Sequence, residues 1–181
     1  TLLAKCTETE KSQIAKEFVK FNERCMIRLL GDMRAYNYVI VPIHDFDQVV
    51  YRIRAIDFDQ QCYEGNFKVY RPQFFKENYP MVKLVKDKLQ DSSIEQYKDE
   101  ERAVLAKRIL SAENRIKILL EIMGEDELAP ESHLQQLQME LYRYTNDLNF
   151  KKAKSMGEIM NAAFEFITRN FKNTNLFKFK M

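Results

Sequence analysis

Three polar side chains that suit phosphoryl transfer lie within residues 29–59, which read LLGDMRAYNYVIVPIHDFDQVVYRIRAIDFD. Asp32 and Asn37 follow a predicted helix, and Asp57 follows a predicted strand. Phosphoryl transfer needs a carboxylate that orients or deprotonates the acceptor hydroxyl, and oxygen ligands that hold Mg²⁺ on the nucleotide phosphates. Because Mg²⁺ keeps several of its waters, few protein ligands suffice. These three side chains supply the required oxygens.

A predicted β-hairpin brings the two ends of this stretch together. Tyr38–Val41 is β-branched and aromatic and is limited by Pro42, whereas residues 49–56 alternate between apolar and basic side chains. Such alternation is typical of a half-buried strand. We expect the two strands to pair across a rather long polar loop. The hairpin then returns Asp57 to the neighbourhood of Asn37.

Helices account for most of the remaining chain. Residues 1–30 are expected to form a helix that Thr7 or Thr9 caps and Gly31 ends, because glycine readily follows a helix in the left-handed conformation. Beyond residue 60 we expect an irregular aromatic segment and then helices, two of which open with Ser-x-x-Glu capping boxes. The expected ranges are 72–78, 81–89, 92–124 (capping box at Ser92), 131–148 and 155–167 (capping box at Ser155), followed by a frayed tail at 173–181. The expected fold class is mainly α with a small β-hairpin, in a single domain spanning residues 1–181.

Composition places the chain among ordinary globular proteins. The 29 Lys and Arg residues nearly balance the 27 Asp and Glu, so the charge pattern predicts neither a nucleic-acid nor a membrane-surface partner. The three cysteines are odd in number and widely spaced, which favours free thiols in a reducing, cytoplasmic compartment. No apolar run approaches the roughly 18 residues of a membrane helix. The chain begins with Thr rather than Met, so we expect it to be cut from a longer protein or to have been processed.

Residues 31–37, Gly-Asp-Met-Arg-Ala-Tyr-Asn, resemble the catalytic loop of the protein-kinase-like superfamily, in which an Asp and an Asn are separated by four residues. The Gly-Asp start and the Ile-Asp-Phe-Asp motif at residues 56–59 are closest to the aminoglycoside phosphotransferase and choline kinase branch. The resemblance implies a C-terminal helical lobe. Residues 1–30 would lead into the catalytic loop, residues 31–60 would hold that loop with the hairpin and metal loop, and residues 61–181 would form a helical subdomain.

The same resemblance implies a role for each polar residue. Asp32 takes the position of the catalytic base, and Arg34 falls where protein kinases often carry a Lys near the transferred phosphate. Asn37 and Asp57 take the positions of the ligands that bind Mg²⁺ and ATP. Asp59 occupies the position of the trailing acid and is a third candidate metal ligand. The implied activity is ATP- and Mg²⁺-dependent transfer to a small molecule or to a protein Ser/Thr hydroxyl.

The sequence also departs from the family pattern. Leu30 stands where the family usually has a histidine before Gly-Asp. No glycine-rich phosphate loop and no strand Lys with a helix Glu partner is present, so the nucleotide-binding N-terminal lobe is missing from this chain. We therefore expect the chain to be part of a longer protein, or to be inactive.

Two other functions stay open. One is a binding or scaffold module without catalysis, either a degenerate kinase-like lobe or an unrelated helical domain. In that case Ile-Asp-Phe-Asp would be a strand-end turn whose carboxylates cap backbone N–H groups. The other is a helical oligomerisation segment at residues 92–124, although its apolar spacing does not keep strict heptads.

Overall fold

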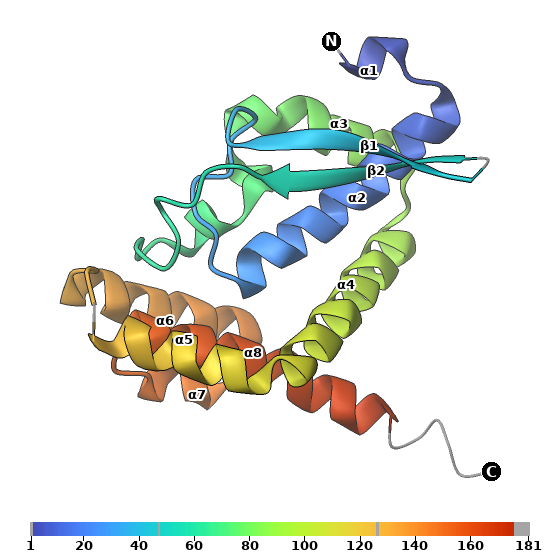
Figure 1. Ribbon diagram of the computed structural model, residues 1–181. Coiled ribbons are helices and arrows are strands. Elements are labelled where there is room, and N and C mark those ends of the chain that lie inside the picture. Colours follow the sequence, from blue (N-terminus) through green and yellow to red (C-terminus); the bar gives the residue numbers. More distant parts are fainter. Residues whose placement is uncertain (1, 47, 126, 176–181) are drawn as a thin grey trace, which may run out of the picture.

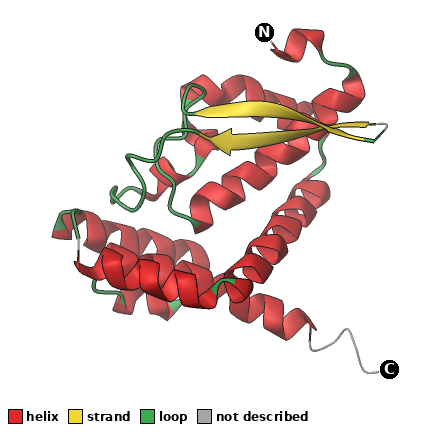
Figure 2. Ribbon diagram, viewed as in Figure 1, coloured by secondary structure: helices red, strands yellow, loops and turns green. Residues whose placement is uncertain are grey.

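The computed structural model describes residues 2–46, 48–125 and 127–175, and within them it is mainly helical with one two-stranded antiparallel sheet (Figures 1 and 2). This confirms the predicted class of a mainly α protein with a small β-hairpin. The elements are α1 Leu2–Lys5, α2 Glu8–Ile27, β1 Tyr38–Asp45, β2 Gln48–Ala55, the 3₁₀ turns η1 Phe67–Tyr70, η2 Pro72–Phe74 and η3 Lys76–Asn78, α3 Tyr79–Lys88, α4 Asp91–Ser111, α5 Glu113–Glu125, α6 Glu131–Thr145, α7 Leu148–Lys152 and α8 Met156–Asn175.

Helix α2 connects two hydrophobic cores. The hairpin lies along one side of α2, and α4 leads from this region to a second group of helices, α5 to α8 (Figure 1). Phe18, Phe21 and Cys25 of α2 pack with residues of the hairpin and of α3 in the first core. Met26 and Ile27, at the end of α2, belong to the second core, which is built mainly from α4, α6, α7 and α8. The chain that leaves α2 toward Asp32 therefore starts at the junction of both cores.

The hairpin is longer and its loop is shorter than predicted. The strands pair from Tyr38 opposite Ala55 to Asp45 opposite Gln48, which leaves two residues between them. Residue 47 lies outside the described residues. β1 also continues through Pro42, because both strands of a two-stranded sheet are edge strands and an edge tolerates a residue without an N–H group.

The residue 1–30 helix is in fact two helices, α1 and α2, because Thr7 caps the second. The Thr7 hydroxyl accepts a hydrogen bond from the Glu10 N–H at 3.2 Å, and the Glu10 carboxylate accepts one from the Thr7 N–H at 2.8 Å. This reciprocal pair is a capping box. The Thr7 N–H bond holds the pKa of Glu10 below its usual range. The predicted cap is confirmed at Thr7.

Helix α2 ends before Gly31, so the predicted glycine terminus is wrong. Leu29 adopts the left-handed conformation with φ 48°. The Leu30 N–H bonds to the Cys25 carbonyl at 2.9 Å and the Leu29 N–H to the Met26 carbonyl at 3.3 Å, which is a Schellman motif. A left-handed non-glycine residue costs roughly 1–2 kcal/mol. Complete burial of the Leu29 side chain contributes about 1.5–3 kcal/mol, which offsets that cost.

The predicted helix at 92–124 is also wrong in two respects. It begins one residue earlier, at Asp91, without a side-chain cap from Ser92. It breaks at Ala112 into α4 and α5, because the change of direction lets both helices pack against α8. The Ser155 cap is confirmed, since its hydroxyl accepts the Glu158 N–H at 3.1 Å.

Three other predicted boundaries also shift. The helix predicted at 131–148 ends at Thr145, and the next residue, Asn146, is left-handed with φ 57°. The range 72–78 forms 3₁₀ turns rather than a single helix. Helix α8 continues to Asn175, and the rest of the predicted frayed tail, residues 176–181, lies outside the described residues.

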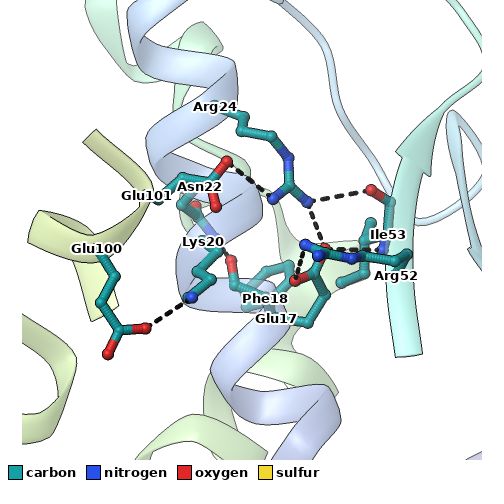
Figure 3. A network of polar contacts seen from close by, with 9 residues as sticks. All are labelled: Glu17, Phe18, Lys20, Asn22, Arg24, Arg52, Ile53, Glu100 and Glu101. Atoms are coloured by element: carbon teal, nitrogen blue, oxygen red, sulfur yellow. Dashed lines mark hydrogen bonds and ion pairs between the residues drawn. The ribbon is translucent and has the colours of Figure 1, made fainter. Parts of the chain in front are cut away.

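A buried ion-pair network fixes the hairpin to α2 and α4 (Figure 3). Arg24 of α2 lies 2.5 Å from the Glu17 carboxylate and 3.2 Å from the Glu101 carboxylate of α4. Glu17 also accepts the Ile53 N–H at 3.1 Å, and Arg24 donates to the Ile53 carbonyl at 3.1 Å. Burial alone would lower the pKa of the Arg24 guanidinium, but the charges of Glu17 and Glu101 raise it above its ordinary value. Arg24 is therefore charged at neutral pH.

A second buried carboxylate, Glu23, lies on the same helix. Its Oε2 accepts a hydrogen bond from Arg102 Nε of α4 at 2.9 Å. Burial raises the pKa of Glu23, and the charge of Arg102 opposes that rise only in part. The two networks tie α4 to α2 through two consecutive residues of α4, Glu101 and Arg102.

Replacing Arg24 with Met should destabilise the protein by about 3–5 kcal/mol, because buried Glu101 loses its ion-pair partner and buried Glu17 keeps only Arg52, at 3.6 Å. Urea unfolding measures this change. The matched control is Lys83→Met, which removes an exposed ion pair with Asp87 and should change the free energy of unfolding by less than about 0.5 kcal/mol. Equal stability of the two variants would contradict a stabilising role for the buried ion pairs of Arg24.

The raised pKa of Glu23 predicts a pH dependence. The folded state binds the Glu23 proton more tightly than the unfolded state, so this group contributes stability at low pH that is lost as pH rises through its folded pKa. The free energy of unfolding of the wild type, minus that of Glu23→Gln, should therefore fall as pH rises above the ordinary Glu range. Urea titrations from pH 4 to pH 8 measure this difference in unfolding free energy. A difference that rises with pH would show that the pKa of Glu23 is lowered in the folded state.

Candidate active site

The Asp32 loop is held in an unusual backbone conformation directly after the Schellman turn. Asp32 has φ 53°, and its N–H donates to the Val69 carbonyl at 3.1 Å. Its carbonyl accepts the Arg34 N–H at 2.8 Å and the side-chain amide of Asn37 at 2.7 Å. Left-handed non-glycine residues of this kind cluster at functional sites, where the surrounding structure holds them. The Asp32 side chain remains about one-third exposed, at 33%.

Asn37 and Asp32 are brought into contact, as the spacing predicts. Asn37 is 92% buried, and its Nδ2 lies 3.4 Å from Asp32 Oδ2. The Asn37 Oδ1 has no hydrogen-bond partner among the described residues, so this amide oxygen can still bind a cation. The Asn37 carbonyl accepts the Ile56 N–H at 3.0 Å, which extends the pairing by one residue beyond Tyr38 and Ala55. Asp57 is the next residue, so the hairpin returns the chain backbone to Asn37.

Asp57 and Asp59 form a turn at the end of β2. Asp57 Oδ1 accepts the Asp59 N–H at 3.1 Å, whereas Asp57 Oδ2 and the Asp59 carboxylate bond no other described residue. No three His, Cys, Asp or Glu side chains of the described residues form a group that could hold a metal ion. A cation here would therefore rely on one or two carboxylate oxygens, the Asn37 amide oxygen and water. That hard-oxygen set with several waters suits Mg²⁺.

Arg34 lies over the site but is already paired. Its Nε is 2.7 Å from Asp32 Oδ1, and its NH1 is 3.1 Å from Glu77 Oε1. Its guanidinium also lies 4.9 Å from the centre of the Phe75 ring. The hydrogen bond to Asp32 raises the pKa of Arg34. The pKa of Glu77 is lowered, mainly by a hydrogen bond from its own backbone N–H and to a smaller extent by Arg34. Arg34 thus orients the Asp32 carboxylate as well as adding positive charge beside it.

Two residues that support the candidate site could not be recognised from the sequence pattern. Asn78 is completely buried, and its amide donates to the Met33 and Pro72 carbonyls at 2.8 Å each while its oxygen accepts the Tyr38 hydroxyl at 2.9 Å. Asn78 therefore joins the Asp32 loop, the 3₁₀ segment and the start of β1. Glu77, its neighbour, is the second partner of Arg34. Both residues lie in an ordinary polar stretch, and only the fold shows what they contact.

Gly31 is needed for close approach. A Cβ atom at this position would lie 2.5 Å from the Gln60 carbonyl oxygen and 3.2 Å from Val69 Cγ1. The segment after Asp57 therefore packs directly against the residue before Asp32. The glycine brings the two loops of the site together, which is a different role from the predicted helix end.

Cys62, beside this segment, is not a nucleophile. Burial raises the pKa of its thiol to about 12, with a smaller contribution from the charge of Glu127. Its Sγ lies 3.7 Å from Met160 Sδ in the second core. A buried thiol of raised pKa is unreactive.

Comparison with protein families, with curated proteins and with solved structures finds no match to this chain. Among the described residues, no helix combines the length and apolarity required to cross a bilayer. The kinase-like assignment therefore depends on the residues and geometry described above.

Substituting Gly31 with Ala should destabilise the protein by about 1–3 kcal/mol, since a Cβ would overlap the Gln60 backbone. Gly124→Ala is the matched control, because nothing lies within 4 Å of a Cβ there and α5 should gain roughly 0.5–1 kcal/mol. Thermal or urea unfolding compares the two, and a Gly31→Ala variant as stable as the wild type would contradict the close approach.

Proposed function

We propose that this chain forms the catalytic lobe of an ATP- and Mg²⁺-dependent phosphotransferase. The observation that carries the proposal is the contact between Asp32 and Asn37 at the base of a hairpin that returns Asp57 to the Asn37 backbone. The three residues follow one another in the order that the resemblance to the kinase-like catalytic and metal loops implies. The acceptor class, a small molecule or a protein Ser/Thr hydroxyl, stays open.

Each residue has a role that its surroundings favour. Asp32, oriented by Arg34, would accept a hydrogen bond from the acceptor hydroxyl and take its proton. Asn37 Oδ1 and Asp57 Oδ2, which bond no other described residue, would hold Mg²⁺, and Asp59 adds a further carboxylate. Bound Mg²⁺ supplies positive charge to the nucleotide phosphates.

Exposed apolar residues beside the site support a further part of the proposal, a covering lobe. Tyr36, Ile56 and Phe58 alternate with the proposed ligands and are 64%, 57% and 48% exposed. Apolar residues gathered on a surface in this way mark an interaction site. A nucleotide-binding lobe would cover them and complete the ATP site.

A scaffold without catalysis is the second candidate, and the Asp57 turn favours it. The Asp57 carboxylate already accepts the Asp59 N–H, as a strand-end turn requires without any metal. Asp32 likewise has a structural partner in Arg34. Metal binding distinguishes the two candidates.

Mn²⁺, a paramagnetic substitute for Mg²⁺, should broaden the amide NMR signals of Asn37 and Asp57 selectively. Asp57→Asn should abolish that broadening because it removes a charged oxygen ligand. Asp87→Asn, an exposed acid of α3, is the matched control and should leave the broadening unchanged. Broadening that spares Asn37 and Asp57, or that survives Asp57→Asn, would favour the scaffold.

In the longest natural chain that contains this lobe, Asp32→Asn should lower phosphate transfer from Mg²⁺-ATP by about 10²–10⁴-fold, as expected for loss of a general base. Radiolabelled γ-phosphate measures the transfer, and the stability of the variant is checked by thermal unfolding. Transfer that persists in both Asp32→Asn and Asp57→Asn would remove the phosphotransferase proposal.

A further inference from the structure

A pocket of about 270 Å³ lies among α2, α3 and α4, away from the residues of the candidate active site. Its apolar lining comes from all three helices: Phe18, Val19, Met26, Val82, Val85 and Ile94. The volume equals that of about nine water molecules at about 30 Å³ each. This is below the range of drug-sized pockets, so a ligand of about ten non-hydrogen atoms fits it.

Arg71 provides the cation of this pocket. Its guanidinium lies 4.8 Å from the ring centre of Phe74, 5.1 Å from that of Tyr144 and 5.5 Å from that of Phe67. These cation–π contacts hold the side chain in place. No hydrogen bond or ion pair joins that side chain to another described residue, so its N–H donors lack an oxygen acceptor within the described chain. An immobilised arginine with unmatched donors on an apolar pocket is suited to a planar anion.

The other charged groups of the pocket leave it net positive. Lys86 lines it without an ion pair among the described residues, and Lys98 pairs with a glutamate outside the pocket. Glu23 is matched by Arg102 at 2.9 Å, and the positive charges of Lys98 and Arg71 also act on it. Asp91 lies in the first turn of α4, where the helix dipole compensates a carboxylate.

We propose that this pocket binds a small amphipathic carboxylate, with the carboxylate on Arg71 and an aliphatic tail of about seven carbons along the apolar wall. Arginine and carboxylate match as a bidentate pair, which is among the stronger hydrogen-bonded contacts in proteins. The tail would cover the valine, isoleucine and methionine side chains of the lining. This inference does not depend on phosphoryl transfer, because none of its residues belongs to the candidate active site.

Isothermal titration calorimetry of the full chain with octanoate tests the proposal. Acetate, which lacks the tail, and octan-1-ol, which lacks the charge, are the matched ligands. Octanoate should bind at one saturable site, and each of the other two should bind at least about tenfold more weakly. An affinity for octan-1-ol equal to that for octanoate, or no saturable octanoate binding, would overturn the proposal.

Variants of pocket residues then test whether octanoate binds in this pocket. Arg71→Gln should weaken octanoate binding by about tenfold or more, whereas Arg54→Gln, an exposed arginine of β2, should leave it unchanged. Since Arg71→Gln loses three aromatic contacts and could fail to fold, Ile94→Phe is an independent test. Ile94 belongs to neither hydrophobic core, and a phenylalanine there would fill the pocket and abolish binding. Unchanged affinity in Ile94→Phe, or an equal loss in Arg54→Gln, would place octanoate elsewhere and overturn the inference.

Discussion

The clamp of Glu17 and Arg24 on the Ile53 backbone is the interaction on which the rest of the structure depends. In an antiparallel pair, the N–H and carbonyl of one residue point to the same side, and those of Ile53 point away from β1 toward α2. The side chains of Glu17 and Arg24 therefore bond both backbone groups of Ile53 on the outer edge of β2. Because Arg24 also pairs with Glu101, one guanidinium sets the distance between the hairpin, α2 and α4.

The candidate active site follows from this arrangement. Once β2 is fixed along α2, β1 is fixed by pairing, and both ends of the hairpin arrive where α2 ends. Three residues with positive φ, Leu29, Asp32 and Cys62, lie within this junction. The Cys62 N–H bonds to the Leu29 carbonyl at 2.9 Å, so the loops before and after the hairpin hold each other's backbones. Backbone contacts thus place the two loops of the site, and the contacts of Asp32 with Arg34 and Asn37 then orient the side chains.

Local patterns in the sequence predict the hairpin, the Thr7 cap and the approach of Asp57 to Asn37. Each depends on neighbouring residues: the alternation of residues 49–56, a threonine at the start of a helical segment, and the pairing of two consecutive strands. The roles of Arg24 and Asn78 could not be predicted, because they join segments far apart in the chain: Arg24 contacts Ile53 and Glu101, and Asn78 contacts Met33 and Tyr38. Gly31 shows the same limit, since its spacing favours a helix end but its actual role depends on Gln60, 29 residues later.

The Schellman turn at Leu29 has a consequence for how the molecule opens. A glycine would adopt this turn without help, but a leucine adopts it only while its side chain lies in the second core. The reversal of the chain before Asp32 therefore forms together with the packing of α4, α6 and α8. Amide hydrogens of the Asp32 loop should then exchange with solvent only through cooperative unfolding of these helices. The free energy of opening of the loop should therefore equal that of the second core.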